Sequence, residues 1–208
     1  MVRPAFRTFL LLAGPLLILS ACAAGSRLTV PGELTRPARS VKPAAGAPLA
    51  AVLDFSYAAA PDGVLGRDYD RIRPIVWKGQ PGKTMADLIA GALGENGVAA
   101  VRGGVDGAGA DTVPVRISGV VRRFEVNARS TGGVSRTTEA TVSVTFTAEG
   151  QGPGLSGPSE HTVTSSSSLE VLIVTPNDLR DVLMSAANNV AEEAARKLLE
   201  ARVFSPAS

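Results

Sequence analysis

The clearest pattern in the chain is an alternation of apolar and polar residues between Ala140 and Glu149. The polar positions carry Thr, Ser or Glu. The apolar set is Ala140, Val142, Val144, Phe146 and Ala148. A period of two with one apolar face predicts a strand in an antiparallel sheet that is covered on one side only.

Two neighbouring segments extend this sheet. Apolar residues alternate over Val113–Ile117 and again at Phe124 and Val126, so we expect a bulge near Gly119 to shift the face between them. After a glycine-rich connection, Glu160–Ser168 predicts a third strand that is polar on both faces. Such a strand is weakly held in register, and its serine run is also compatible with disorder.

Two segments have helical spacing instead. Apolar residues over Met85–Glu95 predict a helix, and Thr84 with Asp87 resembles a capping box in front of it. A longer apolar stripe predicts a helix over Pro176–Arg202, with Thr175 at the N-cap and proline at the first helical position.

The first half of the domain has weaker signals. Leu49–Tyr57 and Val98–Arg102 read as strands, and Arg71–Trp77 reads as an edge or bent strand because Pro74 interrupts it. Ala58–Asp70 is rich in turn residues and predicts a loop. The expected fold is α+β: one curved, mostly antiparallel sheet of about 4–6 strands, with two helices on one face and the C-terminal helix long.

The N-terminus has the layout of a secretory signal. Arg3 and Arg7 precede an apolar run, Thr8–Leu19, which ends in the tetrapeptide Leu19-Ser20-Ala21-Cys22. This tetrapeptide resembles the bacterial lipobox. The resemblance implies cleavage between Ala21 and Cys22 and acylation of the Cys22 thiol, for example with palmitate. The alternatives are a secretory signal followed by a chance cysteine, or an apolar anchor that is retained.

The chain then divides into three parts. We expect a lipoprotein signal peptide at 1–21, a lipidated cysteine and flexible Pro/Gly/Ala-rich tether at 22–48, and a single α+β domain at 49–205. The alternative for the tether is that Ser26–Val30 adds a short strand to the domain.

Charge excludes one class of partner. Cleavage before Cys22 removes Arg3 and Arg7, which leaves 19 of the 21 basic residues against 19 acidic residues. The mature chain is therefore close to neutral, and no aromatic–basic cluster indicates nucleic-acid binding. With its only cysteine acylated, the domain has no thiol for a disulfide.

The sequence motifs that could suggest catalysis are incomplete. Gly79–Thr84 ends in Gly-Lys-Thr before a helix, but a P-loop needs a glycine where Trp77 stands, so a turn plus a helix cap is favoured. Ser156 is not in a nucleophile elbow because Pro158 replaces the final glycine. His161, the only histidine, reads as a solvated residue of a polar strand.

Four acidic residues lie close together in the sequence: Asp54, Asp62, Asp68 and Asp70. They lack the spacing of a calcium-binding loop, so they are interpreted as solvated loop residues. A single histidine and no free thiol argue against a zinc site. We therefore expect no catalytic, cofactor-binding or metal-binding residues and no enzymatic activity.

The mature domain resembles the YajG-like uncharacterised lipoproteins of proteobacteria in the pattern and order of its elements. The segments that carry this resemblance, besides the lipobox, are Val52–Phe55, Met85–Leu93, Ile117–Arg122, Thr141–Ala148 and the helix that begins at Asn177. The resemblance implies an envelope lipoprotein of unsettled role, and it transfers no functional residue.

The expected function is that of a membrane-anchored cell-envelope lipoprotein, acting as a non-enzymatic binding or accessory component for an envelope protein, glycan or lipid. The alternative is a lipid-binding auxiliary lipoprotein of an envelope transport or assembly system, which would need an apolar cleft between helix and sheet. Ala23 follows the cysteine where aspartate retains enterobacterial lipoproteins in the inner membrane, so we expect the outer membrane, facing the periplasm.

Overall fold

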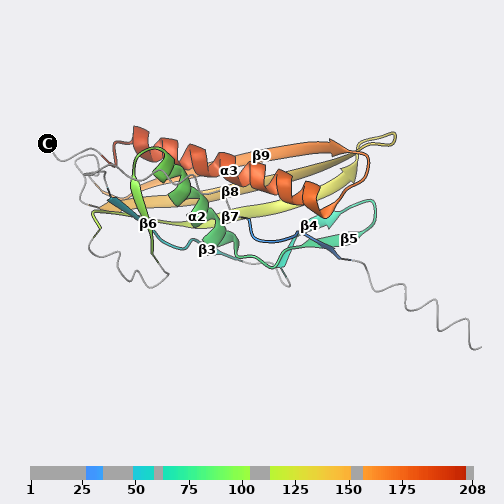
Figure 1. Cartoon of the computed structure of the whole chain (residues 1–208), viewed down its shortest axis with the longest axis horizontal. Helices are drawn as coiled ribbons and strands as arrows, with labels where there is room; N and C mark the ends of the chain where they lie inside the picture. Colours follow the sequence, from blue (N-terminus) through green and yellow to red (C-terminus); the bar gives the residue numbers. More distant parts are fainter. Residues whose placement is uncertain (1–26, 35–48, 59–62, 104–112, 151–156, 205–208) are drawn as a thin grey trace, which may run out of the picture.

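The computed structural model of the chain describes residues 27–34, 49–58, 63–103, 113–150 and 157–204. Within these ranges the chain forms one sheet of nine strands and two helices (Figure 1). The strands are β1 Leu28–Thr29, β2 Leu49–Val52, β3 Ser56–Tyr57, β4 Val64–Asp68, β5 Arg73–Val76, β6 Ala99–Arg102, β7 Val115–Ser130, β8 Arg136–Gly150 and β9 Ser159–Val171. The helices are α2 Pro81–Glu95 and α3 Pro176–Glu200.

The sheet is larger and more mixed than expected. One edge of β7 pairs antiparallel with β8, which pairs antiparallel with β9. Along its other edge β7 pairs in turn with three short parallel strands, β2, β3 and β4. A strand of sixteen residues is too long for one short strand to cover. The prediction of 4–6 mostly antiparallel strands was wrong because strands of two to five residues carry no readable period.

Strand β7 changes its buried face partway along. Val115, Ile117 and Val121 are buried before the change, and Phe124 and Val126 after it. The shift lies between Val121 and Arg123, where β7 has one residue more than β8. The bulge is therefore real, but it lies at position 122 rather than at Gly119.

Strand β9 is held in register by polar contacts. Across the polar face, Thr141, Ser143 and Thr145 of β8 pair their hydroxyls with Ser166, Thr164 and Thr162 of β9, at oxygen–oxygen distances of 3.0, 2.7 and 3.0 Å. The serine run is thus an ordered strand, because cross-strand hydroxyl pairs replace the missing apolar face.

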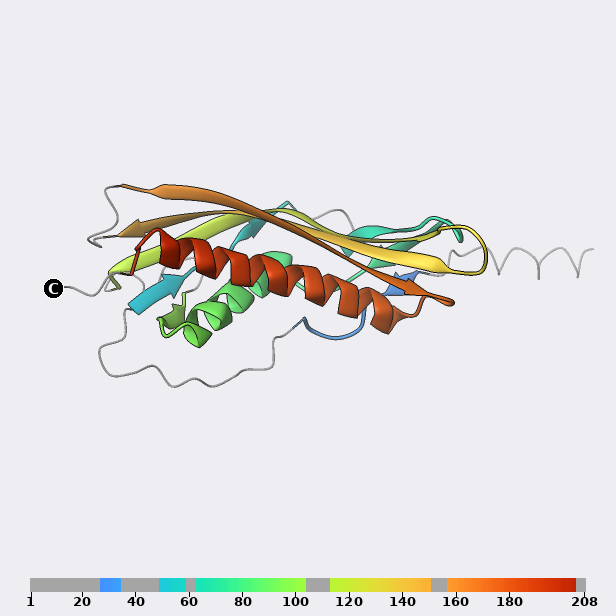
Figure 2. The same ribbon diagram turned by 90° about the horizontal axis from the view of Figure 1, so that it is seen from above.

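Both helices cover the same face of the sheet, as predicted (Figure 2). Helix α3 lies over β8 and β9, and α2 lies over β2 and β6 and against α3. The largest fully buried side chains between these layers include Phe124, Phe146, Met85, Leu93, Leu179 and Leu183. In the described residues, neither helix has the length and apolar character needed to cross a bilayer.

The helix starts differ in how well they were predicted. At α3 the Thr175 side chain accepts from the Asp178 backbone N–H, and the Asp178 carboxylate accepts from the Thr175 N–H, which confirms the expected N-cap. Helix α2 begins a turn earlier than expected, at Pro81, and Thr84 is a buried helical residue rather than its cap. Proline suits the first helical position because its φ is already helical.

Residues 27–34 belong to the folded domain. Strand β1 pairs parallel with β5, and the Val30 N–H donates to the carbonyl of Val76 over 2.9 Å. Leu28, Val30 and Leu34 are buried, as the alternative of a short strand at Ser26–Val30 requires. The span expected to be a tether at 22–48 therefore contains a packed segment. Ala21 and Cys22 lie outside the described residues.

Candidate functional site

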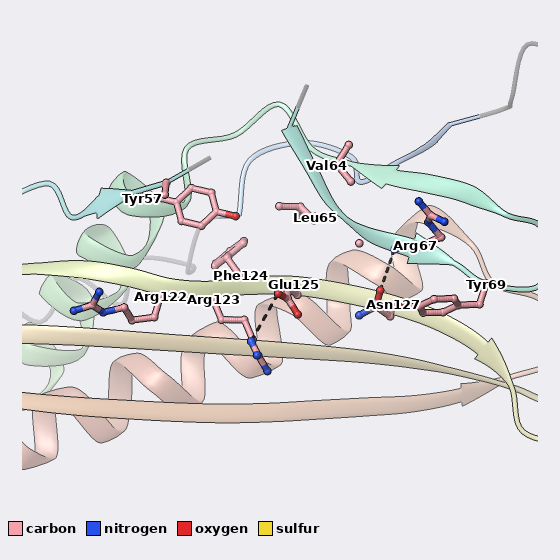
Figure 3. Close-up of a pocket in the computed structure, with 12 residues that line it drawn as sticks. Tyr57, Val64, Leu65, Arg67, Tyr69, Arg122, Arg123, Phe124, Glu125 and Asn127 are labelled. Carbon is pink, nitrogen blue, oxygen red and sulfur yellow. Dashed lines mark hydrogen bonds and ion pairs between the residues drawn. The ribbon is translucent and has the colours of Figure 1, made fainter. Parts of the chain in front are cut away.

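A cavity lined by described residues opens at the edge of β7, on the side away from β8. Here β3 ends and β4 has not yet begun to pair, so part of β7 has no neighbouring strand. The cavity has a volume of about 630 Å³, within the range of small-ligand sites. Its walls come from β3, β4 and β7 (Figure 3): Tyr57, Ala58, Val64–Arg67, Tyr69, Arg122–Glu125 and Asn127.

Local structure explains how the cavity forms. The bulge at Arg122 interrupts the alternation of β7, and both Arg122 and Arg123 are exposed. Strand β4 approaches β7 closely at Gly66, where a Cβ atom would lie 2.0 Å from the carbonyl oxygen of Val126. Next to it, the Arg67 backbone N–H donates to Asn127 Oδ1 over 3.0 Å.

The cavity combines basic and apolar walls. Arg123 Nε lies 3.7 Å from Glu125 Oε1, an exposed pair that adds little stability. Burial, and then the negative charge of Glu125, raise the pKa of the Tyr57 hydroxyl, so it stays a hydrogen-bond donor at neutral pH. With the partly exposed side chains of Tyr57 and Val64 on the apolar side, the site suits a ligand with an apolar body and an anionic or carbonyl group.

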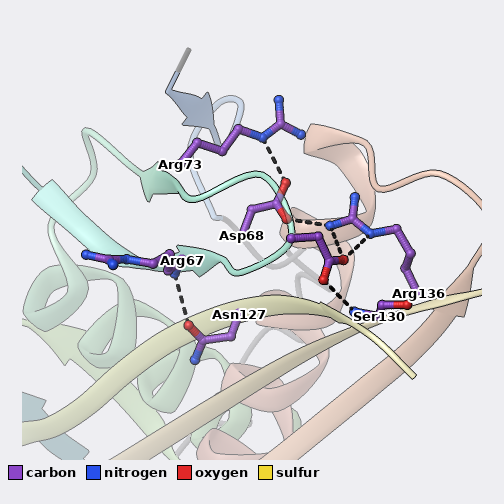
Figure 4. A network of polar contacts seen from close by, with 7 residues as sticks. Arg67, Asp68, Arg73, Asn127, Ser130 and Arg136 are labelled. Carbon is purple, nitrogen blue, oxygen red and sulfur yellow. Dashed lines mark hydrogen bonds and ion pairs between the residues drawn. The ribbon is translucent and has the colours of Figure 1, made fainter. Parts of the chain in front are cut away.

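A second polar cluster, at one end of the sheet, is structural (Figure 4). Asp68 has no exposed surface and forms ion pairs with Arg73 and Arg136; Arg73 Nε lies 2.8 Å from its Oδ2 atom. Arg136 also contacts Asp70 Oδ2 at 2.7 Å, and the Ser130 N–H donates to Asp70 Oδ1 over 3.2 Å. Burial alone raises the pKa of Asp68, but the hydrogen bonds and charges of the two arginines outweigh it and lower that pKa.

The interpretation of the four aspartates as solvated loop residues was therefore wrong for Asp68. Its two arginine partners make burial of the carboxylate tolerable. Asp70 shares one of these arginines, and Asp54 pairs with Arg102 at the other end of the sheet. Asp62 lies outside the described residues.

His161 is not a solvated strand residue either. It stands opposite Phe146 in the β8–β9 register, with ring centroids 5.5 Å apart. Its Nε2 atom is buried and has no hydrogen-bond partner among the described residues. The ring faces the helix side of the sheet, since alternate residues of β9 point toward α3.

The glycines of the Gly-Lys-Thr segment serve packing. A Cβ atom on Gly82 would lie 1.8 Å from the carbonyl oxygen of Phe55, and one on Gly79 would overlap the ring of Trp77. The expected turn is present, since the chain bends at Gly79 before α2, but the expected helix cap is wrong because α2 begins at Pro81 and Thr84 lies inside it. Ser156 lies outside the described residues.

The residues that line the cavity were not identified from the sequence. One signal was present: Arg122 and Arg123 form a basic doublet inside an otherwise alternating strand. Such a doublet indicates a bulge with both side chains turned outward. Tyr57 and Leu65 line the cavity only because distant segments pair, so no local sequence pattern predicts this role.

Comparison with known proteins supports the fold. No family model and no curated protein matches the chain. A crystal structure of a Xanthomonas campestris protein of the DUF330 family is similar, with a TM-score of 0.52 and 14% identity, covering 85% of this chain and 96% of that one. At this identity the likeness shows a shared fold. The specific resemblance to YajG-like lipoproteins is not confirmed.

A minor lipoprotein from Acinetobacter baumannii is also similar, with a TM-score of 0.41 and 12% identity, covering 77% of this chain and 96% of that one. Structures similar to this chain thus include a lipoprotein. At that TM-score nothing further about this chain follows from the likeness.

Proposed function

We propose that this protein is a cell-envelope lipoprotein, held in the membrane by an acylated Cys22, whose domain is a non-enzymatic binding component. The anchor is supported by the tetrapeptide Leu19-Ser20-Ala21-Cys22 at the end of an apolar run. The binding role is carried by the cavity beside the β7 bulge, whose basic and apolar walls can hold a ligand or a partner's side chain. Ala23 favours the outer membrane as its location.

The anchor is tested by labelling cells with radioactive palmitate. The wild-type chain should incorporate label and the Cys22→Ser variant should not. Continued labelling of Cys22→Ser, or no labelling of the wild type, would contradict acylation at this residue.

The binding role is tested by photocrosslinking in cells. A photoreactive residue at Glu125, which lines the cavity, should trap a specific partner. The matched control is Ser185, an exposed residue of α3 remote from the cavity lining. Identical adducts from the two positions, or none from either, would argue against the cavity as a binding site.

A lipid ligand is the second candidate function, because the cavity places arginines beside apolar residues. It is not the helix–sheet cleft expected from the sequence, but it would suit an amphiphile of an envelope transport or assembly system. Native mass spectrometry of the Cys22→Ser chain should then detect bound lipid, with less in an Arg67→Ala, Arg123→Ala double variant. Absence of lipid from both forms would leave a protein or glycan partner.

We also propose that the domain has no catalytic role for His161. A general base must reach the proton that it removes from a substrate, whereas His161 Nε2 is buried and its ring packs on Phe146. If a hydrolytic activity is found, its full retention in His161→Ala supports this proposal, and its loss in a folded variant contradicts it.

A further inference from the structure

The exposed apolar side chains of the domain are gathered at one end. Seven large hydrophobic residues are exposed among the described residues, and six of them lie at the end of the sheet where β7 turns into β8. We call these six the apolar tip: Tyr69, Ile72, Val134, Leu169, Leu172 and Ile173. The most exposed are Val134 at 83% and Ile72 at 78%.

Three chain connections bring the apolar tip together. The β4–β5 turn follows Asp68, which pairs with Ala128 near the end of β7. The β7–β8 turn is closed by the pair Ser130 and Arg136, and Arg136 also pairs with Val171, just before the link to α3. Figures 1 and 2 both show the three connections side by side at the right-hand end of the molecule.

Ion pairs and a hydrogen bond join the connections that form the apolar tip. Arg136, at the start of β8, binds both Asp68 and Asp70 of the β4–β5 hairpin, and the Ser130 N–H binds Asp70. Ile72 has a φ of 52°, a rare conformation for a β-branched residue, and is exposed despite it. Strain of this kind persists only where the surrounding structure imposes it, and it concentrates at functional positions.

The proposed lipid anchor enters the domain at the same end. Strand β1 runs parallel to β5 with Leu28 opposite Ile75, and β5 leaves the β4–β5 turn at Arg73. Arg27, the first described residue, is therefore only a few ångströms along the sheet from that turn. Cys22 precedes Arg27 by five residues, which reach at most about 18 Å when fully extended.

We propose that the apolar tip docks on the lipid bilayer that holds the Cys22 acyl chains. This inference rests on the proposed acylation of Cys22. A short connection keeps the tip beside the bilayer, and exposed apolar loops partition into the boundary between headgroups and acyl chains. Arg71, exposed in the same turn, has a side chain suited to lipid phosphates.

The test uses the acylated, signal-cleaved protein in vesicles of phosphatidylethanolamine and phosphatidylglycerol. Because Cys22 is the only native cysteine and would be acylated, one introduced cysteine can carry a spin label. The tip positions are Val134→Cys and Ile173→Cys. The control is Val101→Cys, an exposed apolar residue at 43% in β6, at the opposite end of the sheet. All three are exposed, so the label should not disturb the core.

Oxygen concentrates in the bilayer, so labels at the apolar tip should collide with oxygen more often than the Val101 label does. They should collide several-fold less often than the Val101 label with a nickel chelate, which stays in water. Equal access of the chelate to all three labels would overturn the proposal. So would a photocrosslinker at Ile173 that traps a protein in cells while the tip labels stay in water. Mass spectrometry of Cys22 separates the two hypotheses: an unacylated protein overturns both, whereas an acylated protein with a tip in water overturns only the docking.

Discussion

The sharpest stability test is the replacement of Asp68 by Asn. Asp68 is completely buried and its carboxylate binds Arg73 and Arg136, whose side chains are only 15% and 12% exposed. Asn keeps the shape but removes the negative charge, and its NH2 group, which cannot accept, replaces one of the two oxygens that face Arg73 and Arg136. Arg136 retains Asp70, so Arg73 is the group that loses most.

The magnitude follows from the two charged contacts. Removing one partner of a buried ion pair costs about 3–5 kcal/mol, and the remaining neutral hydrogen bond places Asp68→Asn near the lower value, at about 3 kcal/mol. For a domain of this size that corresponds to a fall in Tm of roughly 6–12 °C. Urea unfolding followed by far-UV circular dichroism, in the unacylated Cys22→Ser background, measures the loss directly.

Asp54→Asn is the matched control. Asp54 also pairs with an arginine, Arg102, but the two side chains are 28% and 29% exposed and Arg102 has a second carboxylate partner in Asp87. Exposed pairs contribute about 1 kcal/mol or less, so the control should fall well short of the Asp68 variant. Equal losses of stability in the two variants would refute the claim that burial makes the Asp68 pair important.

The contribution of Asp68 to stability also depends on pH. Because the folded-state pKa of Asp68 is lowered, its contribution to stability is complete above its unfolded pKa of about 3.9 and is lost as pH falls through the folded value. The stability difference between the unsubstituted protein and Asp68→Asn should therefore be constant from about pH 5 to 8 and shrink below about pH 4. Unfolding curves that stay equally far apart under acid conditions would contradict this sign.

Two further predictions concern local structure and are measured by thermal unfolding. Within α2, Gly82→Ala places a Cβ atom 1.8 Å from the Phe55 carbonyl oxygen and should destabilise by about 1–3 kcal/mol, whereas Gly94→Ala meets open space and should stabilise by up to about 1 kcal/mol. Effects of the same sign at both glycines would contradict the packing role of Gly82. Thr175→Ala removes the acceptor for the Asp178 N–H and should cost about 1 kcal/mol; an unchanged Tm would show that the cap is dispensable.

The elements that could be predicted from the sequence are those long enough to show a hydrophobic period. Strand β8 and helix α3 each have enough residues for one apolar face to be read directly, and the structure confirms both. Strand β4 was predicted as part of a loop because the sequence Pro61-Asp62-Gly63 and Gly66 are typical of turns, whereas its strand conformation comes from its partners β5 and β7.

The polar contacts show the same dependence on tertiary structure. Arg136 lies 68 residues from Asp68, so no local sequence pattern predicts their ion pair. The cavity also depends on distant partners, since Tyr57 and Leu65 reach it only through the pairing of β3 and β4 with β7. Fold class could thus be read from the longest elements, whereas the binding surface required the register of the shortest ones.

The placement of β1 changes what the anchor can do. The sequence indicates a 26-residue spacer from Ala23 to Pro48, which would reach about 80 Å when extended and let the domain search far from the membrane. Because Leu28 pairs beside Ile75, only the residues between Cys22 and Arg27 separate the proposed lipid from the domain. With Cys22 acylated as proposed, the domain would be held within about 18 Å of its anchor and would meet partners in or beside the membrane. The proposed anchor therefore favours a membrane-associated partner over one far from the bilayer.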